Sequence, residues 1–235
     1  MIKDYIAFDL ETTGLDIETD SIIEIGGVKV RNGKVVDRFM EFVKPLNPIS
    51  PMITNITGIT NEMVMHARDV KTVLYDFIDF CEKDILIGHN LMFDFKFTKK
   101  FANMYGISFE KRGIDTLQIA RKTLSDLESK RLESLCSYYH ITNTSAHRAY
   151  HDALATAKIY HMLAHDFEES NPACFQPKEL IYRPKKIQPC TKKQLEFIDS
   201  LCKQYQLPFP NEAESFTRSE ASKYIDHIIS IYGRK

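Results

Sequence analysis

Two carboxylates, Asp9 and Glu11, stand two residues apart where the apolar run YIAFDL gives way to Thr-Thr-Gly. The run predicts a buried strand, and because strand side chains alternate between faces, both carboxylates would leave the sheet on the same side. Asp94 follows the apolar run ILIG at the start of a predicted helix; Asp152 lies near the start of another, with His147 five residues before it. Strand ends and helix starts can converge on one cleft, so these five side chains are the candidate chemistry of the protein.

Four carboxylates in one cleft need positive charge, because like charges in a dry site cannot all stay ionised. Hard divalent cations take oxygen ligands, and a pair of them roughly 4 Å apart is a recurring device for cutting phosphodiester bonds. A lone Asp-x-Glu pair after a strand is common and usually binds no metal. The presence of all three acidic stretches in one domain-sized region favours a nuclease. In order along the chain they are FDLETTGL, GHNLMFDF and HRAYHD.

FDLETTGL, HNLMFD and HRAYHD resemble the three motifs of the DEDD, or DnaQ-like, 3′-to-5′ exonuclease superfamily, to which the epsilon proofreading exonuclease of bacterial DNA polymerase belongs. The stretches TNITGIT and IDTLQIAR resemble the segments between those motifs, so the resemblance covers about residues 4–168. Together the motifs are specific, whereas each alone is not. The resemblance implies a ribonuclease H-like mixed sheet flanked by helices.

Carried over residue by residue, the resemblance makes four acids the ligands of two divalent metal ions, Mg²⁺ or Mn²⁺: Asp9, Glu11, Asp94 and Asp152. It makes His147 the general base, because the histidine branch (DEDDh) has a histidine five residues before the last aspartate. A neutral imidazole, which titrates near pH 6.5 in water, can take a proton from an attacking water at neutral pH.

The resemblance also implies two groups of substrate-binding residues. The loop after the first two acids would contact the 3′-terminal nucleotide through backbone groups and an apolar wedge, and comprises Thr12, Thr13, Gly14 and Leu15. The pocket for that nucleotide would be lined by His89, Asn90 and Phe93. A simple turn glycine at Gly14 and a core role for Phe93 are the structural alternatives.

These implications describe an enzyme that releases nucleoside monophosphates from single-stranded or frayed 3′ ends of DNA, with a DNA polymerase or another replication protein as a candidate partner. Within the same family the alternative is an RNA-trimming exoribonuclease or oligoribonuclease, because contacts to the 2′-hydroxyl distinguish the two polymers. A catalytically silent nucleic-acid-binding protein is the alternative from another class, and the filled catalytic positions argue against it. No nucleotide cofactor is expected, because Gly26 and Gly27 lack the spacing of a dinucleotide-binding loop.

The order of the predicted elements indicates an α/β fold. Two β-rich runs around Asn32 and Gly33 predict an antiparallel hairpin. Strands first, then alternating strands and helices, favour a mixed sheet. Helices are predicted over residues 69–82 and 92–104, from Asp115 onward, and over 131–139 and 149–167. For Asp115, the role of helix N-cap is favoured over that of a further acid at the site.

The chain divides into a body, residues 1–169, a linker, residues 170–189, and a small helical module, residues 190–235. The linker is predicted from four prolines and few apolar positions. The module contains two amphipathic stretches, for which Thr191 and Thr217 are the expected N-caps.

Composition sets broad limits. A chain of 235 residues that is 43% hydrophobic can bury one core of ordinary domain size. No apolar run is long enough to span a membrane and the N-terminus lacks a signal peptide, so a cytoplasmic protein with no membrane partner is expected.

Five widely spaced cysteines favour reduced thiols. Residues 1–170 carry 20 Lys and Arg against 25 Asp and Glu. Such an acidic body needs bound cations to approach an anionic polymer.

Overall fold

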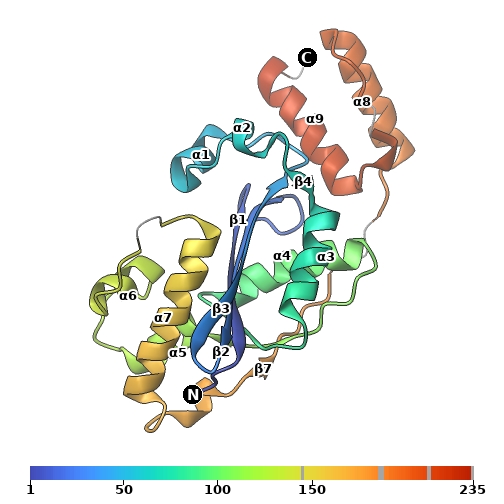
Figure 1. Cartoon of the computed structure of the whole chain (residues 1–235). Coiled ribbons are helices and arrows are strands. Elements are labelled where there is room, and N and C mark those ends of the chain that lie inside the picture. The colour runs from blue at the N-terminus through green and yellow to red at the C-terminus, as the bar shows by residue number, and fades with distance from the viewer. Residues whose placement is uncertain (144–145, 185–187, 211–212, 234–235) are drawn as a thin grey trace. The chain divides into compact units, whose positions relative to one another are not determined.

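The computed structural model describes residues 1–143, 146–184, 188–210 and 213–233 (Figure 1). In these ranges no helix is both long and apolar enough to cross a membrane. The chain divides into two compact units. The first comprises residues 1–15 and 20–184, and the second comprises residues 16–19 with the C-terminal part of the chain.

Within the described residues, the first unit is built on a mixed sheet of seven strands in the order β4-β3-β2-β1-β5-β6-β7. β1, β2 and β3 are antiparallel neighbours, whereas β5 runs parallel to β1 and β6 parallel to β5. At the edges, β4 is parallel to β3 and β7 antiparallel to β6. The strands are β1 (Tyr5–Thr12), β2 (Ile22–Arg31), β3 (Lys34–Lys44), β4 (Arg68–Asp69), β5 (Leu86–Gly88), β6 (Arg112–Asp115) and β7 (Lys178–Glu179).

The hairpin between β2 and β3 forms where the Asn-Gly dipeptide predicts it. Asn32 and Gly33 have positive φ angles of 51° and 75°, and Arg31 pairs with Lys34 across the turn. A two-residue turn with positive φ at both positions follows the twist of the flanking strands, and Asn and Gly adopt it at low cost. The local sequence therefore accounts for the position of this hairpin.

Helices cover both faces of the sheet. α7 (Ala149–Phe167) lies against β1, β2 and β5, with α5 (Thr116–Thr123) and α6 (Leu132–Tyr138) beside it. α3 (Val70–Cys81) and α4 (Leu91–Met104) cover the opposite face (Figure 1). Two short helices, α1 (Pro51–Thr57) and α2 (Asn61–Val64), lie between β3 and β4. This arrangement confirms the predicted α/β fold with a mixed sheet.

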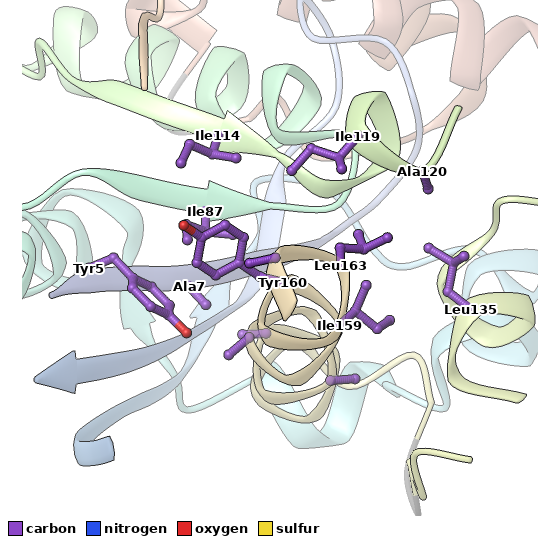
Figure 2. Close-up of a cluster of buried hydrophobic side chains, with 14 of the residues drawn as sticks. Tyr5, Ala7, Ile87, Ile114, Ile119, Ala120, Leu135, Ile159, Tyr160 and Leu163 are labelled. Atoms are coloured by element: carbon purple, nitrogen blue, oxygen red, sulfur yellow. The ribbon is translucent and has the colours of Figure 1, made fainter. Parts of the chain in front are cut away.

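The side chains of β1 alternate between the two helical layers. Tyr5 packs against Tyr160 of α7, with ring centroids 5.4 Å apart, in a cluster of buried apolar side chains (Figure 2). Phe8 points the other way, and its ring lies 5.3 Å from that of Phe77 on α3. The odd-numbered positions of β1 therefore face α7, and these include both carboxylates of the first motif.

Polar side chains begin two of the helices on this sheet. The carboxylate of Asp69 accepts the N–H of Thr72 at 3.0 Å and starts α3. Asp115 caps α5 by accepting the N–H of Leu117 at 3.0 Å, which confirms the capping role. The same carboxylate oxygen accepts the N–H of Asn90 at 3.0 Å, so it also ties the start of α4 to β6.

The expected linker needs a correction, because residues 170–184 belong to the first compact unit. A 3₁₀ turn, η1 (Pro172–Phe175), places the Phe175 ring in the core, and β7 then adds an edge strand to the sheet. Leu180 is buried as well. A few apolar residues suffice to dock this segment, although its prolines made it resemble a free linker. Residues 185–187 of the expected linker lie outside the described residues.

The C-terminal module contains two helices, α8 (Lys192–Tyr205) and α9 (Arg218–Tyr232), with a 3₁₀ turn, η2 (Ala213–Ser215), before the second. Thr191 and Thr217 start them with capping boxes, as predicted. The helices pack on each other through a small apolar core that comprises Ile198, Leu201, Cys202, Ala221 and Ile228. All five cysteines are free, as predicted.

Candidate active site

A cavity of about 420 Å³ opens at the end of β1, between the starts of α6 and α7. It brings together side chains that are up to 143 positions apart in the sequence. The lining residues are Asp9, Glu11, His89, Arg131, Leu132, Glu133, Ala146, His147 and Asp152. Four of the five predicted catalytic residues therefore line one cavity, and the fifth, Asp94, lies beside it.

Asp94 is joined to β1 by a hydrogen bond. Its side chain is 3% exposed, on the first turn of α4, and its Oδ1 accepts the N–H of Leu10 at 3.1 Å. Leu10 stands between Asp9 and Glu11 on β1, so this bond places the third acid next to the first two. The start of α4 thus reaches the same strand end that carries the first motif.

Asp152 is held in place through both of its carboxylate oxygens. Oδ2 accepts the backbone N–H of His147 at 2.9 Å, and Oδ1 accepts an amide hydrogen from Nδ2 of Asn143 at 2.7 Å. The side chain is 7% exposed, on the first turn of α7. His147 has a φ of 61°, a left-handed conformation that costs energy in a residue other than glycine. The side chain of Asn143 and the backbone of His147 are therefore both directed at this carboxylate.

Gly26 allows α7 to begin very close to the sheet. A Cβ atom at this position would lie 2.0 Å from the backbone nitrogen of Tyr150 and 2.1 Å from the carbonyl carbon of Ala149. Gly26 pairs with Asp9 across β1 and β2. The missing side chain thus brings the first turn of α7, and with it Asp152, onto the strands that carry the other acids.

Glu24 fastens that first turn to β2. Its side chain is 4% exposed, and the residue lies opposite Glu11 in the register of β1 and β2. Oε2 of Glu24 accepts the N–H of Ala149 at 3.0 Å, and the carboxylate also forms an ion pair with the guanidinium of Arg148. The side chain of Glu24 therefore caps α7 from a neighbouring strand.

The acids share a strongly anionic environment. Burial and the neighbouring carboxylates, first among them Asp94, raise the pKa of Asp9 well above its usual range. Burial and the charges of Asp152 and Glu24 raise the pKa of Glu11 to about 8, although Arg148 opposes this shift. Burial likewise raises the pKa of Asp94 and of Asp152, against the hydrogen bonds that each accepts. Each shift reflects the cost of keeping a buried carboxylate ionised close to other carboxylates.

This donor set fits a divalent cation. Ligand atoms of Glu11, His147 and Asp152 all lie within 4.8 Å of one another, so these three side chains could hold a metal ion. The carboxylates of Asp9 and Asp94 add further hard oxygen donors close by. A bound cation would relieve the repulsion that raises the carboxylate pKa values.

His147 stands at the rim of the cavity. Its side chain is 50% exposed, and Nε2 lies 3.3 Å from Oε1 of Glu133 on α6. The ring is thus accessible to water while a carboxylate faces one of its nitrogens. Such a ring can accept a proton at the mouth of the site.

The predicted substrate loop does not line this cavity among the described residues. The hydroxyl of Thr12 donates to the carbonyl of Gly14 at 2.7 Å, and that of Thr13 lies 3.1 Å from Oδ1 of Asp20. These bonds hold the loop in a compact turn. Leu15 is 84% exposed, so its apolar side chain projects freely from that turn.

His89 lines the cavity, but both of its ring nitrogens are already engaged. Nε2 lies 2.9 Å from the carbonyl oxygen of Lys130, and Nδ1 lies 2.9 Å from the hydroxyl of Thr116. Because a carbonyl only accepts hydrogen bonds, Nε2 carries the proton. Asn90 and Phe93 are not among the lining residues; Phe93 packs on Phe97 with ring centroids 5.0 Å apart.

A family model, curated proteins and solved structures all match this chain. A family model described as Exonuclease (RNase_T) matches residues 6–160, which is more than half of the chain. The chain belongs to this exonuclease family. The match confirms the family that the three motifs indicate.

Curated relatives of this exonuclease are large polymerases. Over 166 residues it is 40% identical to a DNA polymerase III PolC-type from Caldanaerobacter subterraneus subsp. tengcongensis, which covers 71% of this chain. Over 167 residues it is 38% identical to the DNA polymerase III PolC-type of Bacillus subtilis strain 168, which covers 70% of this chain. The match spans only 12% of the length of either relative.

Solved structures share the fold of the exonuclease. Exonuclease X in complex with 5′ overhanging duplex DNA is 24% identical with a TM-score of 0.56, over 69% of this chain and 92% of that one. The nuclease domain of 3′hExo, a DEDDh family member bound to rAMP, is 20% identical with a TM-score of 0.64, over 76% of this chain and 98% of that one. Both likenesses confirm the ribonuclease H-like exonuclease fold.

The sequence did not predict a supporting role at the exonuclease site for four residues: Glu24, Gly26, Asn143 and Arg148. A glycine inside an otherwise β-rich run signals a close backbone approach, so Gly26 could have been singled out. The other three offer no such signal, because each acts through a partner that only the folded chain brings near.

Proposed function

We propose that the protein is a 3′-to-5′ exonuclease that removes nucleotides from the 3′ ends of DNA and releases nucleoside 5′-monophosphates. The observation that carries the proposal is the gathering of carboxylates from β1, α4 and α7 around one cavity, with a histidine at its rim. Membership of the exonuclease family supports this chemistry.

The proposed metal ligands are Asp9, Glu11, Asp94 and Asp152, for two ions of Mg²⁺ or Mn²⁺. The raised pKa values of these four carboxylates support the assignment, because they mark a site that gains stability from added positive charge. Two divalent cations would supply Lewis-acid activation of water and stabilisation of the leaving oxygen.

His147 is the proposed general base. Water attacks the phosphorus that links the last two nucleotides, the imidazole takes the proton of that water, and the bond from phosphorus to the 3′-oxygen of the penultimate nucleotide breaks. The phosphate stays on the released nucleotide, and the leaving 3′-oxygen takes a proton from solvent, so the shortened chain ends in a 3′-hydroxyl. Glu133, whose Oε1 lies 3.3 Å from Nε2 of His147, can pair with the ring once it is charged.

The terminal nucleotide is proposed to contact the loop Thr12–Leu15 and the start of α4. Leu15 projects as an apolar side chain that could contact the nucleotide. The space where Gly14 would carry a side chain is filled by the Asp20 carboxylate, so Gly14 supports the compact turn of this loop. Asn90 and Phe93 are proposed to line the same subsite. His89 is proposed to support this subsite indirectly, because its ring holds the backbone of Lys130 and the hydroxyl of Thr116 in place.

DNA is the proposed polymer because the curated relatives are DNA polymerases and Exonuclease X was solved with DNA. The same relatives support the proposal that the protein acts beside a DNA polymerase. RNA trimming is the second candidate, since 3′hExo was solved with rAMP. The C-terminal module, proposed as a separate domain, is the candidate surface for a replication partner.

The deciding experiment incubates the protein with three 5′-labelled substrates: single-stranded DNA, duplex DNA with a mismatched 3′ end, and RNA. Each is tested with Mg²⁺, with Mn²⁺ and with chelator. We expect a ladder that shortens from the 3′ end of DNA only when metal is present, and no ladder with Asp9→Asn. Intact DNA in every lane, or cleavage that Asp9→Asn leaves unchanged, would contradict the proposal.

A further inference from the structure

A second cavity, also of about 420 Å³, adjoins the catalytic cavity. Three residues line both cavities: His89, Arg131 and Leu132. The rest of its lining comprises Leu117, Arg121, Glu128 and Lys130. The two cavities therefore lie on either side of one shared wall formed by these three residues.

The second cavity differs from the first in charge. Three cationic side chains and one carboxylate, Glu128, line it, whereas carboxylates dominate the catalytic cavity. Neither the guanidinium of Arg121 nor that of Arg131 has a hydrogen-bond or ion-pair partner among the described residues. In a body whose acids outnumber its bases, this is a local excess of positive charge beside the site.

The cationic wall is held in position. The ring of His89 donates from Nε2 to the carbonyl of Lys130 at 2.9 Å, and its Nδ1 lies 2.9 Å from the Thr116 hydroxyl. The ammonium of Lys130 donates to the carbonyls of Ser125 and Leu127. The segment before α6 is thus held both by His89, which follows β5, and by hydrogen bonds within the segment itself. The backbone that carries Arg131 is therefore fixed in position.

We propose that this second cavity binds a backbone phosphate of the nucleic-acid strand, on the 5′ side of the bond that is cut, through Arg121 and Arg131. The inference rests on the proposed function, because it needs the terminal nucleotide in the catalytic cavity. In this proposal the remaining strand leaves the catalytic cavity over the shared wall, where Arg131 lies. A guanidinium offers two parallel donors that match a phosphate, and its charge is retained at any pH of interest.

The test compares a long substrate with a minimal one. Oligothymidylate carries phosphates on the 5′ side of the scissile bond, whereas the p-nitrophenyl ester of thymidine 5′-monophosphate carries only the scissile phosphate. For Arg121→Gln and Arg131→Gln we expect KM for the oligonucleotide to rise about 5- to 20-fold, the effect of one lost charge-assisted contact at a partly exposed site. The loss on the ester should be several-fold smaller.

Two further measurements make the result specific. In chelator, binding of 5′-fluorescein oligothymidylate should show a salt slope that is smaller in magnitude by about 0.7 for each variant that loses one phosphate contact. Arg121→Lys should recover part of the lost affinity, because it keeps the charge. Lys122→Gln is the matched control, since Lys122 is the next basic residue on α5 and does not line the cavity.

The outcomes separate the two proposals. If the wild-type protein hydrolyses neither substrate, the proposed nuclease function fails. If it hydrolyses both, and the two arginine variants match Lys122→Gln or lose equal activity on both substrates, then the phosphate subsite is overturned while the nuclease stands.

Discussion

Glu24 on β2 and Arg148, the residue that precedes α7, form an ion pair with three hydrogen bonds. Nη2 of the guanidinium lies 2.8 Å from Oε1, and Nε lies 3.2 Å from each carboxylate oxygen. Because Glu24 also lies opposite Glu11 in the sheet, this pair connects the helix that carries Asp152 to the strand that carries the first acids.

Glu24→Gln should weaken both the fold and the site. The substitution leaves Arg148 without its anion, and the guanidinium would then turn to Glu11, a proposed metal ligand. We expect a loss of about 1–3 kcal/mol in the free energy of unfolding, which is below the value for a fully buried pair because Arg148 is 33% exposed. Urea unfolding measures this loss, and a Mg²⁺ titration of activity should show a higher metal requirement.

Glu82→Gln is the matched control, since Glu82 pairs with Lys29 at 2.8 Å but is 61% exposed. Loss of this surface pair should leave the free energy of unfolding nearly unchanged, because solvent screens exposed charges. Equal effects of the two substitutions would refute the special role of the Glu24 pair.

Gly26→Ala should disrupt the site by pushing the start of α7 away from β2. Its Cβ would overlap the backbone at the start of α7, which is closely packed and can move only by shifting the helix. We expect a loss of at least about 2–3 kcal/mol in stability together with nearly complete loss of nuclease activity. Gly106→Asn provides the comparison, because Gly106 has a positive φ that Asn tolerates and nothing lies within 4 Å of its Cβ position. A Gly26→Ala protein with normal stability and turnover would show that α7 does not depend on this contact.

His147→Ala distinguishes a base from a metal ligand. If the imidazole acts as the general base, kcat falls by roughly a hundredfold to ten-thousandfold while Mn²⁺ affinity stays within about twofold. Calorimetric titration with Mn²⁺ measures that affinity directly. A tenfold or greater loss of affinity would assign His147 to the metal instead, an arrangement that its distance from Glu11 and Asp152 permits.

The metal-free protein should lose stability as the pH rises. In the unfolded chain a glutamate titrates near pH 4.3, whereas burial and neighbouring carboxylates raise the pKa of Glu11 to about 8 in the fold. The folded state therefore favours the protonated form, so this contribution is complete below about pH 4 and is lost as the pH rises through 8. The pKa values of Asp9 and Asp94 are also raised, so these two residues likewise make the folded state less stable as the pH rises.

Thermal unfolding in chelator at pH 5–9 tests this dependence. The melting temperature of the wild type should fall toward alkaline pH more steeply than that of Glu11→Gln, by about 2–4 °C for each kcal/mol involved. Added Mg²⁺ should raise the wild-type curve most at high pH, where the carboxylates are ionised. Parallel curves for wild type and Glu11→Gln would rule out the raised pKa.

Local patterns were sufficient to predict several parts of this protein. The period of two along β1 placed Asp9 and Glu11 on one face, and the Asn32-Gly33 turn located the hairpin. The resemblance of HRAYHD to the third family motif, with His147 five residues before Asp152, implied the histidine branch. Each of these features depends on residues within a few positions of one another, where strand alternation, turn geometry and motif spacing operate.

The sequence by itself determined the candidate acids, the histidine, the α/β class and the exonuclease family. Only the tertiary structure decided that Leu10 donates to Asp94 across 84 positions, that Glu24 caps α7 across 125, and that Phe175 docks the segment beyond α7. Such contacts form when buried surfaces pack and their polar groups must find partners, and a local pattern contains no information on which distant partner will be near.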